Sequence, residues 1–327
     1  MAGPLSHIRV LDMTRVLAGP WCGQNLADLG AEVIKVERPG KGDDSRAYGP
    51  PWIKDANGRE TKEAAYFMAA NRGKKSITID IAKPDGQALI RELATRADVL
   101  LENYKTGDLP RYGLGYDDLK KLNPRLVYCS ITGFGQTGPY RERPGFDFMV
   151  QGMGGFMSVT GERDDRPGGG PQRAGVPIVD LMTGMYSTIA VCAAIASREH
   201  SGEGQFIDMA LLDTQVAMLA NLGANYLVSG NVPGRMGNAH QNIVPYQVFE
   251  VAPVNDESKD HIIIAIGNDS QFRKYCVVAN MPELGANPLF ALNRDRVKNR
   301  AQLVPILEAV MRTRRKEIGR ASCRERV

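Results

Sequence analysis

The sequence has few of the patterns that mark disulfides, metal sites or secretion. Its five cysteines include no C-x-x-C pair, which is typical of reduced thiols and argues against a structural zinc. Its four histidines stand singly, without the spacing of metal ligands, so no metal site is expected. The N-terminus lacks a basic segment followed by an apolar run. No signal peptide is therefore predicted, and the cytoplasm is the expected location.

The motifs of several common enzyme classes are also missing. There is no P-loop, and the absence of G-x-S-x-G disfavours Ser–His–Asp hydrolysis. The stretch GFGQTG at 133–138 does satisfy G-x-G-x-x-G, but Pro139 follows it where a helix should begin. The stretch also comes after the fifth predicted strand rather than the first. A dinucleotide site is therefore the less favoured alternative.

The composition is that of an ordinary globular protein. With 327 residues, the chain is long enough for a sizeable core and two domains. Its 43% hydrophobic and 24% charged residues indicate neither disorder nor a membrane span. A net charge of +4 is too small to predict a nucleic-acid partner, although it is compatible with a small polyanionic ligand.

The last eleven residues need a separate interpretation. EIGRASCRERV, residues 317–327, is what a widely used short-read sequencing adapter encodes. We therefore expect that the natural part of the sequence stops near Lys316, and we leave this tail out of the fold prediction.

The first part of the chain alternates between strand and helix patterns. Strands are predicted over 8–13, 31–38, 74–81, 98–104 and 125–132, and helices over 21–30, 85–97 and 116–123. Strand–helix–strand units in series predict a parallel sheet with helices on both faces, an α/β fold of Rossmann-like type. Ligands of such sheets bind beyond the carboxyl ends of the strands, at a topological switch point.

The second part continues with a long apolar helix from Pro177 to Glu199, then a strand and another long helix over 206–227. Strands are predicted again over 246–251 and 261–267, and helices over 270–310. A loop rich in Gly, Asn and Pro separates the two regions. We therefore predict a large domain over 1–224 and a smaller α/β domain over 225–316.

Basic residues recur beside the predicted strand ends. Each could be an ordinary solvated charge, which is the usual state of Lys and Arg. Together they favour a ligand that carries several phosphates, because guanidinium groups suit phosphate geometry. The residues are Arg38, Lys74, Lys75, Arg111 and Arg143.

Asp180 is a carboxylate at the start of the long apolar helix. The commoner role of such an aspartate is to cap the helix, since its side chain accepts the unpaired amide hydrogens of the first turn. A chemical role needs support from the rest of the chain.

That support comes from a resemblance. The stretches VLDMTRVLAGPWCGQNLADLGAEVIKVERPGKGDDSR, NRGKKSITID, LLENYKTGDLPRYGLGYDDL, YCSITGFGQTGP, VPIVDLMTG and GNAHQNIVPYQVF resemble, in this order, the class III coenzyme A transferases, the formyl-CoA and carnitine CoA-transferase family. The resemblance implies a CoA transferase with acyl-CoA and small carboxylic acids as substrates, and with no permanently bound cofactor. It also implies an interlocked homodimer whose chains extend beyond this C-terminus.

The resemblance assigns roles to individual positions. Asp180 matches the nucleophilic aspartate of the family. Further positions match contacts to CoA or its thioester: Leu17, Ala18, Arg38, Ile79, Asp80, Asn103, Tyr104, Lys105, Arg111, Arg143, Phe146 and Asp147. The arrangement resembles most the succinyl-CoA:dicarboxylate branch, whose members act on glutarate. Candidates for binding the distal carboxylate of such a substrate are Asn238, His240 and Gln241, although a polar loop tip explains each of them as well.

Two departures narrow the substrate. The tetraglycine loop of the formyl-CoA branch is replaced by GRMGNAHQN, so formate and oxalate are not expected. Racemases of the family have a catalytic His where this chain has Phe146, which cannot exchange a proton. A racemase is therefore a disfavoured alternative. A fragment that binds CoA without turning it over is the other.

Overall fold

The structure is a computed structural model that describes residues 2–253 and 259–316. The prediction about residues 317–327 lies outside these ranges. The chain forms two compact units. Unit 1 comprises Met1–Met157 and Arg173–Gly223, and unit 2 comprises Ser158–Gln172 and Ala224–Val327.

The grouping of residues 158–172 with unit 2 differs from the predicted large domain over 1–224. The segment is held there by specific bonds: the Gly237 amide donates to the Gly161 carbonyl, and Arg235 pairs with Asp164. No local sequence pattern announces such contacts between distant segments.

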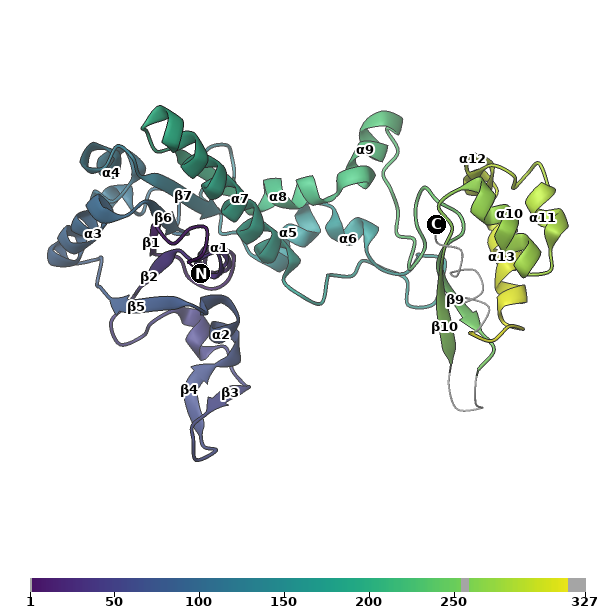
Figure 1. The fold of residues 1–327 in the computed structure, drawn as a ribbon, viewed down its shortest axis with the longest axis horizontal. Coiled ribbons are helices and arrows are strands. Elements are labelled where there is room, and N and C mark those ends of the chain that lie inside the picture. Colours follow the sequence, from purple (N-terminus) through teal and green to yellow (C-terminus); the bar gives the residue numbers. More distant parts are fainter. Residues whose placement is uncertain (1, 254–258, 317–327) are drawn as a thin grey trace. The chain divides into compact units, whose positions relative to one another are not determined.

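Unit 1 is built on a six-stranded sheet in the order β5-β2-β1-β6-β7-β8, with all strands parallel (Figure 1). The α/β fold with a parallel sheet is therefore confirmed. The strands are β1 (Arg9–Asp12), β2 (Glu32–Glu37), β5 (Lys74–Thr78), β6 (Val99–Glu102), β7 (Val127–Thr132) and β8 (Phe206–Ala210).

Successive strand residues point to opposite sides of this sheet, and both sides are apolar. Helices therefore cover both faces. Val10 and Leu101 pack with α1 (Ala18–Asp28) and α7 (Ile178–Ser201) in one apolar cluster. Leu11 and Leu100 pack with α3 (Pro84–Arg96) and α4 (Tyr116–Leu122) in another. The remaining α-helices of unit 1 are α2 (Ala65–Asn71), α5 (Asp147–Met153) and α8 (Leu211–Met218), and α6 (Phe156–Val159) spans the boundary between the two units in the sequence.

α7 is the one helix of the described residues long and apolar enough to cross a membrane by length and composition. The core helix of a soluble protein meets the same two criteria. In this fold, Val191, Ala194 and Ile195 of α7 are buried in the cluster that covers the sheet.

Two features of the chain differ from the sequence prediction. A hairpin of β3 (Trp52–Lys54) and β4 (Glu60–Ala64) precedes α2, where no strands were expected. The helix predicted up to residue 227 is interrupted, because Ala220 has φ of 45° at the start of α9 (Ala220–Ser229). An alanine in that region costs energy that only tertiary packing can offset, so helix propensity gives no sign of the break.

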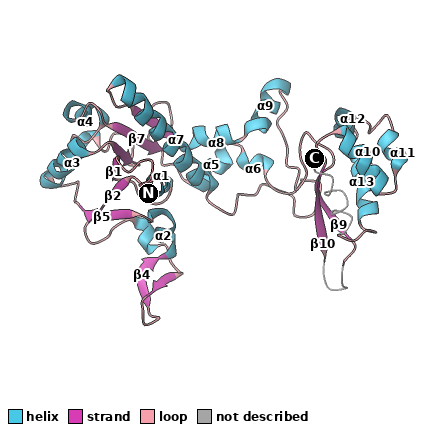
Figure 2. Cartoon of the chain, in the orientation of Figure 1, coloured by secondary structure: helices cyan, strands magenta, loops and turns pink. Residues whose placement is uncertain are grey.

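Unit 2 contains an antiparallel pair of strands, β9 (Tyr246–Val251) and β10 (Asp260–Ala265) (Figure 2). Its helices are α10 (Asp269–Val278), α11 (Pro282–Ala286), α12 (Asn293–Lys298) and α13 (Arg300–Met311). Phe249, Phe272 and Leu303 form its apolar core. Arg296 is fully buried there and is compensated by Asp269 at 2.8 Å and by the Val244 carbonyl at 2.6 Å.

The strand order places a topological switch point between β1 and β6. From β1 the chain moves outward through β2 to β5, and it then returns to the other side of β1 with β6. The loops that leave these two strands therefore diverge, and such a crevice is where α/β sheets bind ligands. The residues that follow are Met13–Leu17 after β1 and Asn103–Lys105 after β6.

Candidate functional site

Asp180 lies in the first turn of α7 but does not cap the helix. The N-cap position is Pro177, and no side chain of the helix bonds to the first-turn amides. The amides of Val179 and Asp180 donate instead to Oδ1 of Asp147, at 2.8 and 3.2 Å. The capping role therefore belongs to Asp147, and the Asp180 side chain is left for another use.

Asp147 is fixed in this position by a short relay. Its Oδ2 accepts a hydrogen bond of 2.6 Å from Nε2 of Gln151, one turn further along α5. The other end of the Gln151 amide, Oε1, accepts from the Ala174 amide at 2.9 Å. This relay holds the carboxylate of Asp147 beside the start of α7.

The environment of Asp180 disfavours its ionised form. Burial raises the pKa of Asp180 to about 7, and the negative charge of Asp147 contributes to the rise. The positive end of a helix dipole is expected to keep a carboxylate in the first turn charged. The structure corrects this expectation, because the first-turn amides stabilise Asp147 and leave Asp180 facing a like charge.

Asp180 opens into a cavity of about 520 Å³ that is formed by unit 1 alone. This volume suits a drug-sized portion of a ligand. The structure brings nine of the predicted residues to the cavity wall. They are Leu17, Ala18, Asn103, Tyr104, Lys105, Arg143, Phe146, Asp147 and Asp180.

The remaining predicted CoA contacts of unit 1 do not line the cavity. Arg38 pairs with Asp44 at 2.6 Å, and Asp44 itself lines the wall, so Arg38 stands just behind the rim. Ile79 is buried against the apolar cluster of α3, whereas Arg111 pairs locally with Asp108. Asp80 accepts from the Ala82 amide at 3.1 Å. Their contact with CoA stays a prediction.

Asn103 has a structural use that its predicted role did not include. Its Oδ1 accepts from the Arg15 amide at 2.9 Å, and its Nδ2 donates to the Arg15 carbonyl at 2.7 Å. The side chain thus binds the turn after β1 from the loop after β6, across the switch point.

Several cations surround the cavity. Arg15, Lys105, Arg141 and Arg143 all line it. The guanidinium of Arg143 lies over the Tyr140 ring at 4.1 Å, and that of Arg15 over the Tyr104 ring at 5.0 Å. Groups held in this way are suited to bind phosphates.

Two tyrosines at the cavity were not found from the sequence. Tyr48 and Tyr66 line it and contact each other edge to face, with ring centroids 5.4 Å apart. Burial raises the pKa of Tyr66 to about 12, and the nearby Asp180 adds to the rise. Tyr66 therefore remains a neutral hydroxyl beside the carboxylate. The sequence stretch around it, AAYFMAAN, reads only as a short apolar helix.

The three candidate substrate residues belong to unit 2. Nδ1 of His240 accepts from the Asn242 amide at 3.0 Å, and its ring stands against Tyr246. Nε2 of Gln241 donates to the Gly234 carbonyl at 2.5 Å. The backbone carbonyls of His240 and Gln241 both accept from Arg300, which fixes this loop. A role of these residues and of Asn238 in substrate binding stays a prediction.

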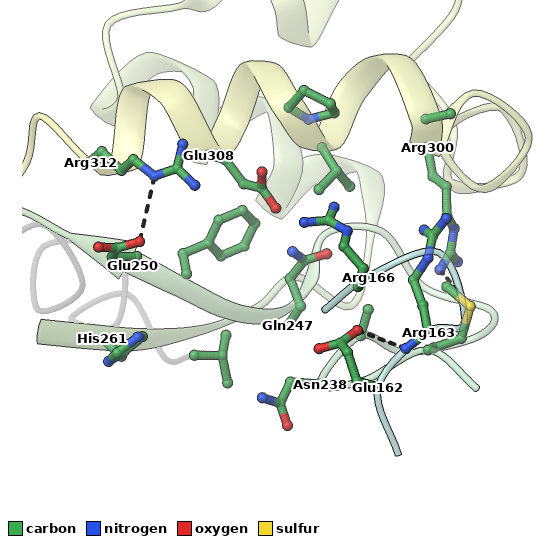
Figure 3. Close-up of a pocket in the computed structure, with 17 residues that line it drawn as sticks. Glu162, Arg163, Arg166, Asn238, Gln247, Glu250, His261, Arg300, Glu308 and Arg312 are labelled. Atoms are coloured by element: carbon green, nitrogen blue, oxygen red, sulfur yellow. Dashed lines mark hydrogen bonds and ion pairs between the residues drawn. The ribbon is translucent and has the colours of Figure 1, made fainter. Parts of the chain in front are cut away.

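Unit 2 contains a cavity of its own, of about 490 Å³, between β9, α13 and residues 162–166 (Figure 3). Arg163, Arg166 and Arg300 approach it from one side, and Glu162 lies among them. At the other end Arg312 pairs with Glu250 at 3.6 Å. Because Glu308 also lines the wall, acidic groups offset most of the positive charge.

Comparison with known proteins places these features in context. The family model described as CoA-transferase family III matches residues 5–326. The succinate–glutarate CoA-transferase of Agrobacterium fabrum is 53% identical over 304 residues, which are 93% of this chain and 73% of that protein. The human succinyl-CoA:glutarate CoA-transferase is 45% identical over 305 residues. These are 93% of this chain and 66% of the human protein, so the chain spans about two thirds of that relative.

Solved structures agree with the family match. A CAIB/BAIF family protein from Brucella suis superimposes with a TM-score of 0.80 at 50% identity, covering 98% of this chain and 81% of that one. A protein of Mycobacterium tuberculosis gives a TM-score of 0.82 at 33% identity, covering 98% of this chain and 81% of that one.

Proposed function

Because this chain belongs to CoA-transferase family III, we propose that it moves coenzyme A from succinyl-CoA to a short dicarboxylate such as glutarate. The observation that carries the proposal is the position of Asp180. It is a partly buried carboxylate, released from helix capping, at the wall of a cavity rimmed by cations. The names of the similar proteins support the choice of donor and acceptor.

The chemistry follows from one carboxylate acting twice. A carboxylate oxygen of Asp180 attacks the thioester carbonyl of the acyl-CoA, the C–S bond breaks, and an aspartyl–acyl anhydride and the CoA thiolate result. The thiolate then attacks the aspartyl carbonyl of the anhydride. This step forms an aspartyl–CoA thioester and releases the first acid as its carboxylate. The acceptor carboxylate attacks the aspartyl thioester, and the same steps in reverse order give the new acyl-CoA.

The raised pKa of Asp180 has a consequence for this reaction. A carboxylate with a pKa of about 7 is a stronger nucleophile than one with the ordinary value, provided that it is ionised. Burial also limits water around anhydride and thioester intermediates, which would otherwise hydrolyse. The hydroxyl of Tyr66 is a candidate hydrogen-bond donor to the oxyanion formed beside Asp180.

The cavity supports this reaction over racemisation. Phe146 precedes α5 as its N-cap residue and is 66% exposed, and its ring carries no proton to exchange. The other alternative is that the chain binds CoA without turnover. It predicts the same cavity, but it gives no reason for Asp147 to take the place of Asp180 as the cap of α7.

A homodimer in the cytoplasm is part of the proposal. Leu227 and Val228 of α9 are 82% and 90% exposed, which is unusual for neighbouring aliphatic residues unless another surface covers them. A second copy of the chain is the expected cover. Sedimentation analysis would give twice the mass of one chain if this is right.

The function is tested with a panel of acceptors and succinyl-CoA as the donor. We expect transfer to glutarate and similar dicarboxylates, measured as formation of the new acyl-CoA by chromatography. Transfer only to monocarboxylates such as carnitine would contradict the proposed specificity. Calorimetric binding of CoA without exchange of labelled succinate into succinyl-CoA would favour the non-catalytic alternative.

A further inference from the structure

The turn that follows β1 is bound by polar side chains at three successive residues. Nζ of Lys35 donates to the Thr14 carbonyl at 2.8 Å. Asn103 bonds to both the amide and the carbonyl of Arg15. Oδ1 of Asp43 accepts from the Val16 amide at 3.1 Å. These side chains come from β2, from the loop after β6 and from the loop after β2, so the turn is fixed from three elements.

Lys35 and Asp43 form an ion pair of 2.8 Å, and their side chains are only 1% and 0% exposed. The pair therefore joins the two ends of the turn, because one partner holds Thr14 and the other holds Val16. Two further bonds, from the amide and hydroxyl of Ser45, fix the Asp43 carboxylate. Burial raises the pKa of Asp43, but Lys35 and Ser45 outweigh it, so the group stays ionised.

The turn needs such restraint because Val16 has φ of 72°. This left-handed conformation is unfavourable for a β-branched residue and persists only where the surroundings enforce it. A buried ion pair is not required for stability, since apolar residues of similar volume often replace one without loss. The pair and the unfavourable conformation occur together beside the site, which indicates a positioning role.

The turn leads into α1, and α1 packs on α7, the helix that carries Asp180. Leu17 and Ala18 follow Val16 and line the cavity. The Ala18 carbonyl packs on Gly184 of α7 so closely that an added Cβ at Gly184 would lie 2.7 Å from it. Gly184 is one helical turn after Asp180. A shift of the turn would therefore move the cavity wall relative to the nucleophile.

We propose that the Lys35–Asp43 pair is a positioning element for acyl-CoA, which holds the Thr14–Val16 turn and thereby sets Leu17 and Ala18 against the helix of Asp180. This inference rests on the proposed binding of CoA in the cavity of unit 1. Neither residue lines the cavity. Their effect on the ligand is therefore transmitted by the turn.

The test replaces both charges at once, as Lys35→Met with Asp43→Leu, so that no unpaired buried charge remains. We expect a folded protein whose Kd for CoA, measured by calorimetry, rises at least about tenfold, which is about 1.4 kcal/mol. The KM for succinyl-CoA should rise in parallel, whereas the KM for the acceptor acid stays unchanged. A folded double variant with the wild-type Kd would overturn the proposal.

A matched control removes another ion pair, of which only the arginine is buried. Arg198 is 4% exposed and pairs with Asp98 at 3.1 Å, just before β6 and so at the opposite end of the strand from Asn103. The variant Arg198→Met with Asp98→Asn should lower thermal stability and leave the Kd for CoA unchanged. An equal loss of CoA affinity in this control would mean that the first effect was general destabilisation, and would overturn the positioning role.

Two further measurements keep the test decisive. If the double variant does not fold, Lys35→Gln with Asp43→Asn removes both charges of the buried pair and retains an acceptor for the Val16 amide, and its Kd should rise about threefold or more. Hydrogen exchange of the peptide over residues 13–21 should be faster in either variant, with or without CoA. Unchanged exchange would overturn the positioning role, whereas failure of the wild-type chain to bind CoA would contradict only the proposed function.

Discussion

At the scale of single residues, the site depends on two aspartates, of which one caps α7 and the other faces the cavity. The sequence places Asp180 at the start of a helix, where capping is the common use. The structure shows that Asp147, 33 positions earlier, accepts the helix amides. No pattern near Asp180 could reveal this, because the capping group comes from another element. The sequence stretch GFD marks Asp147 only through the family resemblance.

The proximity of Asp147 and Asp180 leads to a prediction for the variant Asp147→Asn. Asn retains an oxygen for the amides of α7 but carries no charge, so the pKa of Asp180 should fall below its present value of about 7. The acid limb of kcat/KM for succinyl-CoA should therefore move to lower pH. The control is Asp28→Asn, which removes a carboxylate of α1 that pairs with Arg72. It should leave the acid limb of kcat/KM at the same pH. A merely structural role of Asp147 would lower the rate without moving the midpoint.

Asp180 also makes the stability of the fold depend on pH. Its folded-state pKa of about 7 lies above the ordinary 3.8, so its contribution is favourable at low pH and is lost as the pH rises through about 7. Asp180→Asn removes this loss. We expect the variant to gain melting temperature over wild type at about pH 8.5 and little at about pH 4. Equal differences at both pH values, measured by circular dichroism, would contradict the raised pKa.

At the scale of elements, the strand and helix patterns predicted most of unit 1. The apolar runs of β1, β6 and β7 are buried on both faces, which makes them legible as parallel strands. The β3–β4 hairpin was not predicted, because the sequence of Glu60–Ala64 is polar up to its last residue and shows no alternation of apolar and polar residues. The end of α8 was not predicted, because an alanine such as Ala220 gives no sign in the sequence of its positive φ.

The contact between α1 and α7 predicts the effect of Gly184→Ala. A Cβ at this position would lie 2.7 Å from the Ala18 carbonyl and 2.9 Å from Cβ of Trp21, so the helices must separate. We expect a loss of about 1–3 kcal/mol of unfolding free energy together with a higher KM for succinyl-CoA.

Gly223→Ala is the matched control for Gly184→Ala, because its Cβ would meet only Leu219 at an ordinary 3.5 Å. Alanine has the better helix propensity, so this variant should be neutral or slightly stabilising in a urea titration. Equal stability of the two alanine variants would contradict the close packing of α1 on α7.

At the scale of the whole molecule, the chain combines a six-stranded parallel sheet in unit 1 with a second unit that includes residues 158–172. The predicted boundary near residue 225 lies close to Ala224, where unit 2 resumes. The composition gave no sign that residues 158–172 also belong to unit 2. The cavity that contains Asp180 is lined by unit 1 alone, whereas the candidate substrate residues lie in unit 2. The resemblance therefore assigned nine residues that line one cavity and three that lie in the other unit, and the roles of all of them stay predictions.

The central claim is that Asp180 forms a covalent bond to the acyl group and then to CoA. The most direct measurement is to incubate the wild-type chain with succinyl-CoA and hydroxylamine, and to map the product by peptide mass spectrometry. Hydroxylamine attacks an aspartyl anhydride or thioester, so we predict a hydroxamate on Asp180, formed only when the acyl-CoA is present. Continued transferase activity under these conditions with an unmodified Asp180 would contradict the account.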